Sequence, residues 1–138
     1  FLIEKDSKKE IDWDKLENVV NTSARFLDNV IDANSYSVDK IKKMTRSTRK
    51  TGLGVMGFAD LLISLDIAYD SEEGLALGKK IMRFVKDKAD STSEQLAQER
   101  GVFPAYPGSI YDNDDQPKMR NACRLTVAPT GTISMIAG

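Results

Sequence analysis

Histidine is missing from this chain of 138 residues, and cysteine occurs once, at Cys123. Without histidine, the chain lacks the most common metal ligand and the side chain that most often acts as a general base. A single cysteine excludes an internal disulfide framework and a metal site built from several thiolates. No histidine or cationic helix end flanks Cys123, so we expect a buried structural thiol there.

A strong charge imbalance and long apolar runs are also lacking. The net charge of −1 gives no reason to expect a nucleic acid or a membrane as partner. No apolar run is long enough to span a bilayer and no leader sequence is recognisable, which favours a cytoplasmic protein. The chain starts at Phe1 rather than at a methionine. We therefore expect it to be an internal piece of a longer polypeptide.

Apolar residues recur at helical spacing in three stretches, which predict helices over about 13–33, 58–65 and 71–100. Asp12 or Asp14 is placed to cap the first helix. Residues 70–73 have the form of a capping box for the third helix, and Gly101 is a natural residue to end it. With 41% hydrophobic and 30% charged residues, these helices describe a globular domain.

The segments between these helices are polar. Residues 37–51 carry many lysines and arginines without interleaved aromatics, and we expect them to form a solvated face. Residues 102–119 contain prolines, a glycine and an acidic run, which predict an irregular surface excursion. The acidic run, residues 112–115, does not predict a calcium site, because the glycine and terminal glutamate of an EF-hand loop are missing.

The C-terminal part of the chain is the most suggestive of a ligand site. Residues 125–127 are β-branched or apolar and predict a short buried strand, which Pro129 must end. Gly131 would let the backbone approach a ligand closely and direct its N–H groups at an anion. Three hydroxyl side chains alternate around this glycine and add further donors: Thr130, Thr132 and Ser134. A helix that began after Ile133 would add its N-terminal dipole.

Two interpretations of this loop stay open from the residues themselves. In one, it binds a phosphate group. In the other, it is an ordinary connection from a strand to a helix, and its hydroxyl groups only cap that helix.

A second glycine-rich stretch, residues 52–57, matches the pattern of a dinucleotide-binding fingerprint. Such a fingerprint must follow a buried hydrophobic strand, and residues 45–51 are too polar to form one. A nicotinamide-binding module is therefore a weaker alternative, and it requires a buried strand before Gly52. The structural interpretation is that these glycines allow tight packing of a turn and helix against a neighbouring element.

Several blocks of the sequence, taken in order and spacing, resemble the catalytic chain of ribonucleotide reductases, and most of all the class II, adenosylcobalamin-dependent branch. The blocks are residues 25–32, 52–60, 96–101, and 120–122 together with 128–134. The resemblance implies an α/β fold, namely a ten-stranded α/β barrel made of two five-stranded parallel halves. Residues 1–138 would form a single partial domain of that barrel, a mostly helical segment.

The resemblance also implies an activity, the conversion of ribonucleotides to deoxyribonucleotides by thiyl-radical chemistry for DNA synthesis. In that family the loop that matches residues 128–134 binds the substrate's phosphates, here through Pro129, Thr130, Gly131, Thr132, Ile133 and Ser134. Holding the phosphates would fix the ribose so that its 3′ hydrogen faces the radical. The family's radical-cysteine motif and its two reducing cysteines are absent from the sequence, so we expect the isolated fragment to be inactive.

Cofactor and partners are likewise implied by the resemblance. Adenosylcobalamin would generate the radical and would be bound mainly by parts outside this chain; in a class I enzyme a separate metal-containing subunit would do so instead. The expected partners are a ribonucleoside di- or triphosphate and the remainder of the reductase chain, with a homodimer as an option for the full-length protein. For Asn121 we expect no role beyond packing or hydrogen bonding. The alternative function is a noncatalytic helical interaction module.

Overall fold

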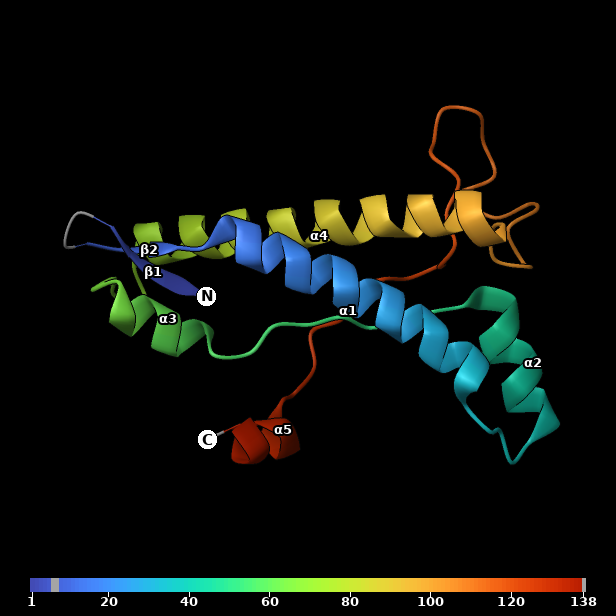
Figure 1. Ribbon diagram of the computed structural model, residues 1–138, viewed down its shortest axis with the longest axis horizontal. Coiled ribbons are helices and arrows are strands. Elements are labelled where there is room, and N and C mark those ends of the chain that lie inside the picture. The colour runs from blue at the N-terminus through green and yellow to red at the C-terminus, as the bar shows by residue number, and fades with distance from the viewer. Residues whose placement is uncertain (6–7, 138) are drawn as a thin grey trace.

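The computed structural model describes residues 1–5 and 8–137, which fold mainly into helices with one small hairpin of strands (Figure 1). Strands β1 (Leu2–Lys5) and β2 (Lys8–Ile11) pair antiparallel, with Leu2 opposite Ile11. We did not predict this hairpin, because strands of four residues are too short to show a clear alternation.

Two long helices, α1 (Trp13–Ala33) and α4 (Glu72–Arg100), lie side by side and form the body of the molecule (Figure 1). Both were predicted, and both have the expected caps. The carboxylate of Asp12 accepts a hydrogen bond from the Lys15 amide, and the hydroxyl of Ser71 accepts one from the Gly74 amide. Helix α4 ends at Gly101, whose φ of +83° favours glycine.

The main hydrophobic core lies between these two helices. Its buried residues come from both of them: Leu16, Val20, Ile81, Val85 and Ala89. Leu53 from the connecting loop and Phe58 from α3 (Phe58–Ser64) pack against this core. The helical spacing of the apolar residues therefore predicted the packing face as well as the helices.

Two of the polar segments differ from the sequence-based prediction. The basic segment contains a helix, α2 (Asp39–Thr48), which has no buried residue. It ends at Arg49, which is only 3% exposed although we expected a solvated basic face. The segment 102–119 also has a core of its own, because Phe103, Tyr106 and Met119 are buried together. Their aromatic and thioether side chains are spaced too irregularly to show a period.

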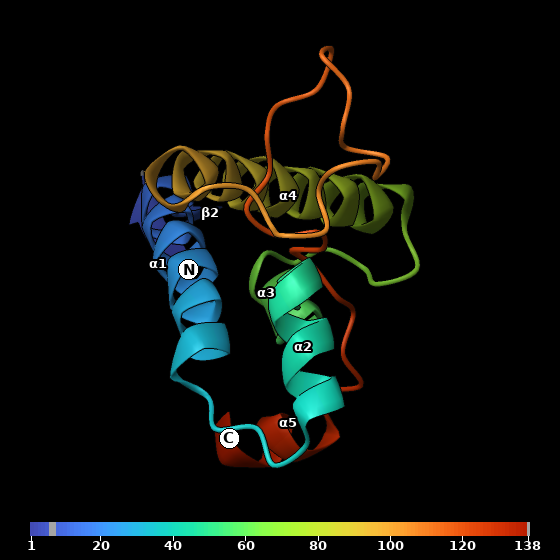
Figure 2. The same ribbon diagram turned by 90° about the vertical axis from the view of Figure 1, so that its right-hand side faces the viewer.

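The chain ends with a short helix, α5 (Gly131–Ala137), which lies apart from α4 in both views of the molecule (Figures 1 and 2). The connecting segment emerges below α1, about midway along that helix, and leads down to α5 (Figure 1). Of the helices described, none combines the length and the hydropathy needed to cross a membrane.

Candidate functional site

The predicted phosphate loop is a tight bend that runs directly into α5. Thr130 has a left-handed backbone with φ of +59°, and its hydroxyl donates to the carbonyl of Pro129 at 2.8 Å. The amide of Ser134 donates to the carbonyl of Thr130, and the Ser134 hydroxyl donates to the carbonyl of Gly131. Among the described residues, apart from its two chain neighbours and the backbone of α5, nothing lies within 4 Å of the position that a Cβ on Gly131 would occupy. The bend is therefore open at its glycine.

The structure places the six predicted loop residues next to one another, and five of them are exposed, whereas Thr130 is half-buried. Helix α5 begins at Gly131, which is earlier than the helix after Ile133 that the sequence left as a possibility. The hydroxyls of Thr130 and Ser134 donate to carbonyls of the bend itself, whereas a capping hydroxyl would accept from an amide of the first helical turn. The Thr132 hydroxyl makes no hydrogen bond within the described residues.

The segment before the loop is not the buried strand that we predicted. Leu125 makes a single parallel bridge with Leu53, and Val127 is 93% exposed. The last hydrogen bond of this pairing runs from the Thr126 amide to the Leu53 carbonyl. Val127 therefore lies beyond the paired residues, where nothing in the described chain covers it.

Two stretches far apart in sequence run together ahead of this loop. The amide of Thr51 donates to the carbonyl of Cys123 at 2.9 Å, and the amide of Leu53 donates to that of Arg124 at 2.8 Å. The Cys123 thiol is half-buried rather than buried, and it donates to the carbonyl of Leu125 at 3.3 Å. Residues 51–54 are thus the immediate neighbours of the segment that leads to the loop.

The glycines of residues 52–57 serve this close approach. A Cβ on Gly54 would lie 2.8 Å from the carbonyl oxygen of Thr126, and one on Gly52 would lie 2.9 Å from its Cγ2. Residues before Gly52 form helix α2 and the left-handed Arg49, not the strand that a dinucleotide fingerprint requires. The nicotinamide alternative is therefore wrong, and the packing interpretation is confirmed.

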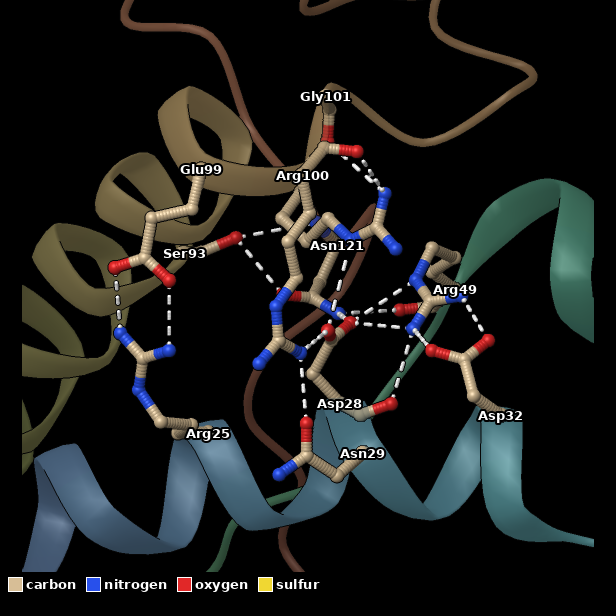
Figure 3. A network of polar contacts seen from close by, with 11 residues as sticks. Arg25, Asp28, Asn29, Asp32, Arg49, Ser93, Glu99, Arg100, Gly101 and Asn121 are labelled. Atoms are coloured by element: carbon tan, nitrogen blue, oxygen red, sulfur yellow. Dashed lines mark hydrogen bonds and ion pairs between the residues drawn. The ribbon is translucent and has the colours of Figure 1, made fainter.

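The buried carboxylate of Asp28 lies at the other end of the two paired stretches, residues 51–54 and 123–126. Asp28 on α1 is fully buried, and its Oδ1 accepts hydrogen bonds from Nε and Nη2 of Arg49 and from Nδ2 of Asn121, all at 2.8–2.9 Å (Figure 3). Its Oδ2 accepts one from Nη1 of Arg100 at 3.1 Å and lies 3.5 Å from Nε of Arg120. We call these residues, together with Asp32, the Asp28 cluster.

The charges of the Asp28 cluster do not balance within it. Three arginines face two carboxylates, Asp28 and Asp32, which leaves one positive charge. Hydrogen bonds from Arg49 hold the pKa of Asp32 below its ordinary value. Burial by itself would lower the pKa of Arg49, but hydrogen bonds to Asp32 and Asp28 outweigh it and raise the pKa above its ordinary value. The two carboxylates therefore hold Arg49 in its charged form.

The lowered pKa of Asp32 predicts a dependence of stability on acid. A carboxyl group whose pKa is lower in the folded than in the unfolded state stabilises the fold above its unfolded pKa. That contribution is lost as the pH falls through the folded pKa. We expect the free energy of unfolding to fall less steeply below about pH 4 in Asp32→Asn than in the wild type. Urea unfolding between pH 7 and pH 3 measures this, and an equal slope in both proteins would contradict it.

The Asp28 cluster was missed from the sequence, although one signal was present. Asp28 and Asp32 are four residues apart on a predicted helix, so they share a face. A pair of carboxylates on one face near a basic segment indicates an ion-pair cluster. The sequence does not show which basic side chain reaches them. Arg49 lies just after α2 in a left-handed turn, which the spacing of apolar residues does not predict.

The comparisons with known proteins place this chain in a family. A family model described as the ribonucleotide reductase barrel domain matches residues 1–138. The chain therefore belongs to the ribonucleotide reductase family, as the sequence blocks had indicated.

Three individual relatives show how similar the chain is to particular members of this family. The chain is 57% identical over 130 residues to a vitamin B12-dependent ribonucleoside-diphosphate reductase of Thermoplasma acidophilum, covering 94% of this chain and 17% of that protein. It is 49% identical to a protein of the same name from Mycobacterium tuberculosis, with 93% and 18% covered. A ribonucleoside-diphosphate reductase subunit alpha of Chlamydia pneumoniae is 31% identical, with 99% and 17% covered. The chain thus spans less than a fifth of the length of these relatives.

Proposed function

We propose that this chain acts as part of a ribonucleotide reductase that converts ribonucleoside diphosphates to deoxyribonucleotides. We further propose that residues 128–134 hold the phosphates of the substrate. The diphosphate is favoured over the triphosphate because relatives up to 57% identical are named for it. The observation that carries the proposal is the open bend at Gly131, in a chain that matches the family model over its whole length.

The chemistry of the loop suits an anion although it carries no positive charge. Residues 125–138 contain no lysine or arginine, so binding would rely on backbone amides and hydroxyl groups. The Thr132 hydroxyl needs no rearrangement to donate to a phosphate oxygen, whereas the hydroxyls of Thr130 and Ser134 would leave their present carbonyl partners. Contacts of this kind fix the position of the ribose, on which hydrogen abstraction depends.

A cobalamin cofactor belongs to the same proposal, and relatives that are 57% and 49% identical are named as vitamin B12-dependent. The cofactor, which supplies the radical when bound, would be held mainly by parts of the reductase outside this chain. The reducing pair of thiols must also come from elsewhere, since Cys123 is the single cysteine.

The remaining expectations are part of the proposal as well. We propose that residues 1–138 are one part of the ten-stranded α/β barrel, and that the parallel pairing of residues 51–54 with 123–126 belongs to its wall. A homodimer of the full-length protein and a cytoplasmic location stay predictions. The noncatalytic alternative remains distinguishable from these, because it requires no anion at residues 130–134.

Removing one hydroxyl tests the proposed loop. In the full-length reductase, we expect Thr132→Ala to raise the KM for a ribonucleoside diphosphate about tenfold, since a hydrogen bond to a charged group contributes roughly 1.5–3 kcal/mol. Thr22→Ala, which removes an exposed threonine of α1, is the matched control and should leave KM unchanged. Steady-state kinetics measure both variants. An unchanged KM in Thr132→Ala would count against the loop and favour the noncatalytic alternative.

A further inference from the structure

We propose that Asn121 is a positioning residue for the phosphate loop. Its side chain joins the segment that leads into the loop to helices α1 and α4 and to the end of α2. The inference rests on the proposed function of residues 128–134, and it adds a residue that does not touch the substrate.

The side chain of Asn121 is buried and its hydrogen bonds run in three directions (Figure 3). Nδ2 donates to Oδ1 of Asp28 on α1 at 2.9 Å and to the carbonyl of Arg49 after α2 at 3.0 Å. Oδ1 accepts from the hydroxyl of Ser93 on α4 at 3.0 Å. The Asn121 backbone amide donates to the same hydroxyl at 3.1 Å. The planar carboxamide of asparagine supplies both donors and an acceptor, which these partners need.

The position fixed at Asn121 is carried toward the loop by backbone pairing. Next to it, the amide of Ala122 donates to the carbonyl of Thr48 at 3.0 Å, and the pairing continues to Thr126 and Leu53. Asn121 Nδ2 also bonds to the Arg49 carbonyl, so both paired stretches start from the same point. We therefore expect a change at Asn121 to loosen the point from which both stretches run.

Beyond Thr126 the loop has little else to hold it. Val127 is 93% exposed, and residues 128, 129 and 131–137 are exposed as well. Within the described residues, the position of the loop therefore depends on the anchored segment before it. Removing a contact that only stabilised the core would lower the free energy of unfolding without changing the KM for the substrate.

The test measures kinetics in the full-length reductase with a ribonucleoside diphosphate as substrate. We expect Asn121→Ala to raise KM about five- to tenfold, a size typical of residues that act through others. Combined with Thr132→Ala, it should raise KM by less than the product of the two single effects, because both act on one contact. Ser93→Ala removes two hydrogen bonds to Asn121 while leaving Asp28 and Arg49 in place, and it should raise KM in the same direction.

The control is Glu99→Gln, which breaks an exposed ion pair of α1 and α4 with Arg25 at 2.8 Å and should leave KM unchanged. If Thr132→Ala raises KM but neither Asn121→Ala nor Ser93→Ala does, or if the effects multiply fully, the role of Asn121 is wrong while the loop stands. If Thr132→Ala itself has no effect, the loop proposal fails and this inference with it. Should Asn121→Ala not fold, Ser93→Ala decides alone.

Discussion

Replacing Asp28 with alanine is expected to lower the free energy of unfolding by about 3–5 kcal/mol. The carboxylate is fully buried and faces three arginines, Arg49, Arg100 and Arg120. Among the described residues, removing it leaves Arg120 with no carboxylate within ion-pair distance, and the Arg120 Nε is already buried there without a hydrogen bond. Leaving one buried charge without its partner lowers stability strongly, even though the intact ion pair stabilises little relative to apolar side chains of similar volume. Urea unfolding followed by circular dichroism measures the loss.

The matched control for this change is Asp87→Ala, which removes an exposed carboxylate from α4. Surface substitutions of that kind change stability by about 0.5 kcal/mol or less. A loss below about 1 kcal/mol in Asp28→Ala would show that water or a rearranged Asp32 neutralises the arginines, and the Asp28 cluster would then not be a stabilising centre.

Replacing Gly131 with aspartate is expected to reduce kcat/KM for a ribonucleoside diphosphate by on the order of 100-fold or more in the full-length reductase. A carboxylate there would lie beside the proposed phosphate position, and two like charges about 4 Å apart near a surface repel by roughly 4 kcal/mol. A Cβ fits there, because no atom beyond the chain neighbours and the helix's own backbone lies within 4 Å of its position among the described residues, and the backbone is helical.

Gly131→Asn is the control for this effect, since it has the same shape without the charge. We expect it to retain most of the activity, and the ratio between the two variants isolates electrostatic repulsion. The difference should shrink at high ionic strength, because salt screens exposed charges. Equal activity of Gly131→Asp and the wild type would exclude an anion at this bend.

The sequence predicted the long helices well because their signals are local. The apolar spacing and the capping residues of α1 and α4 lie within the helices themselves. The bend that we propose as the phosphate loop was also singled out locally, from a glycine between hydroxyl residues after an apolar run. Its surroundings were not, and Val127 proved exposed, because burial depends on what packs against a segment and not on its own composition.

The Asp28 cluster shows why the rest could not be predicted. Its members lie at positions 28, 32, 49, 100, 120 and 121, so their contacts span up to 93 residues of sequence. From the sequence alone, an arginine is expected to be solvated. This expectation holds for most arginines but is wrong for Arg49, which is buried. Asn121 looked unremarkable for the same reason, since its role depends on three partners from three elements.

Arg49 combines a backbone conformation that disfavours its side chain with ionic contacts that need it. Its φ of +46° lies in the region where glycine is preferred, yet its guanidinium bonds to Asp28 and Asp32. Glycine there would relax the main chain but delete both ionic links, while lysine would keep the charge and lose the forked geometry. If position 49 is randomised and the library is selected for thermostability alone, the surviving variants should therefore carry arginine.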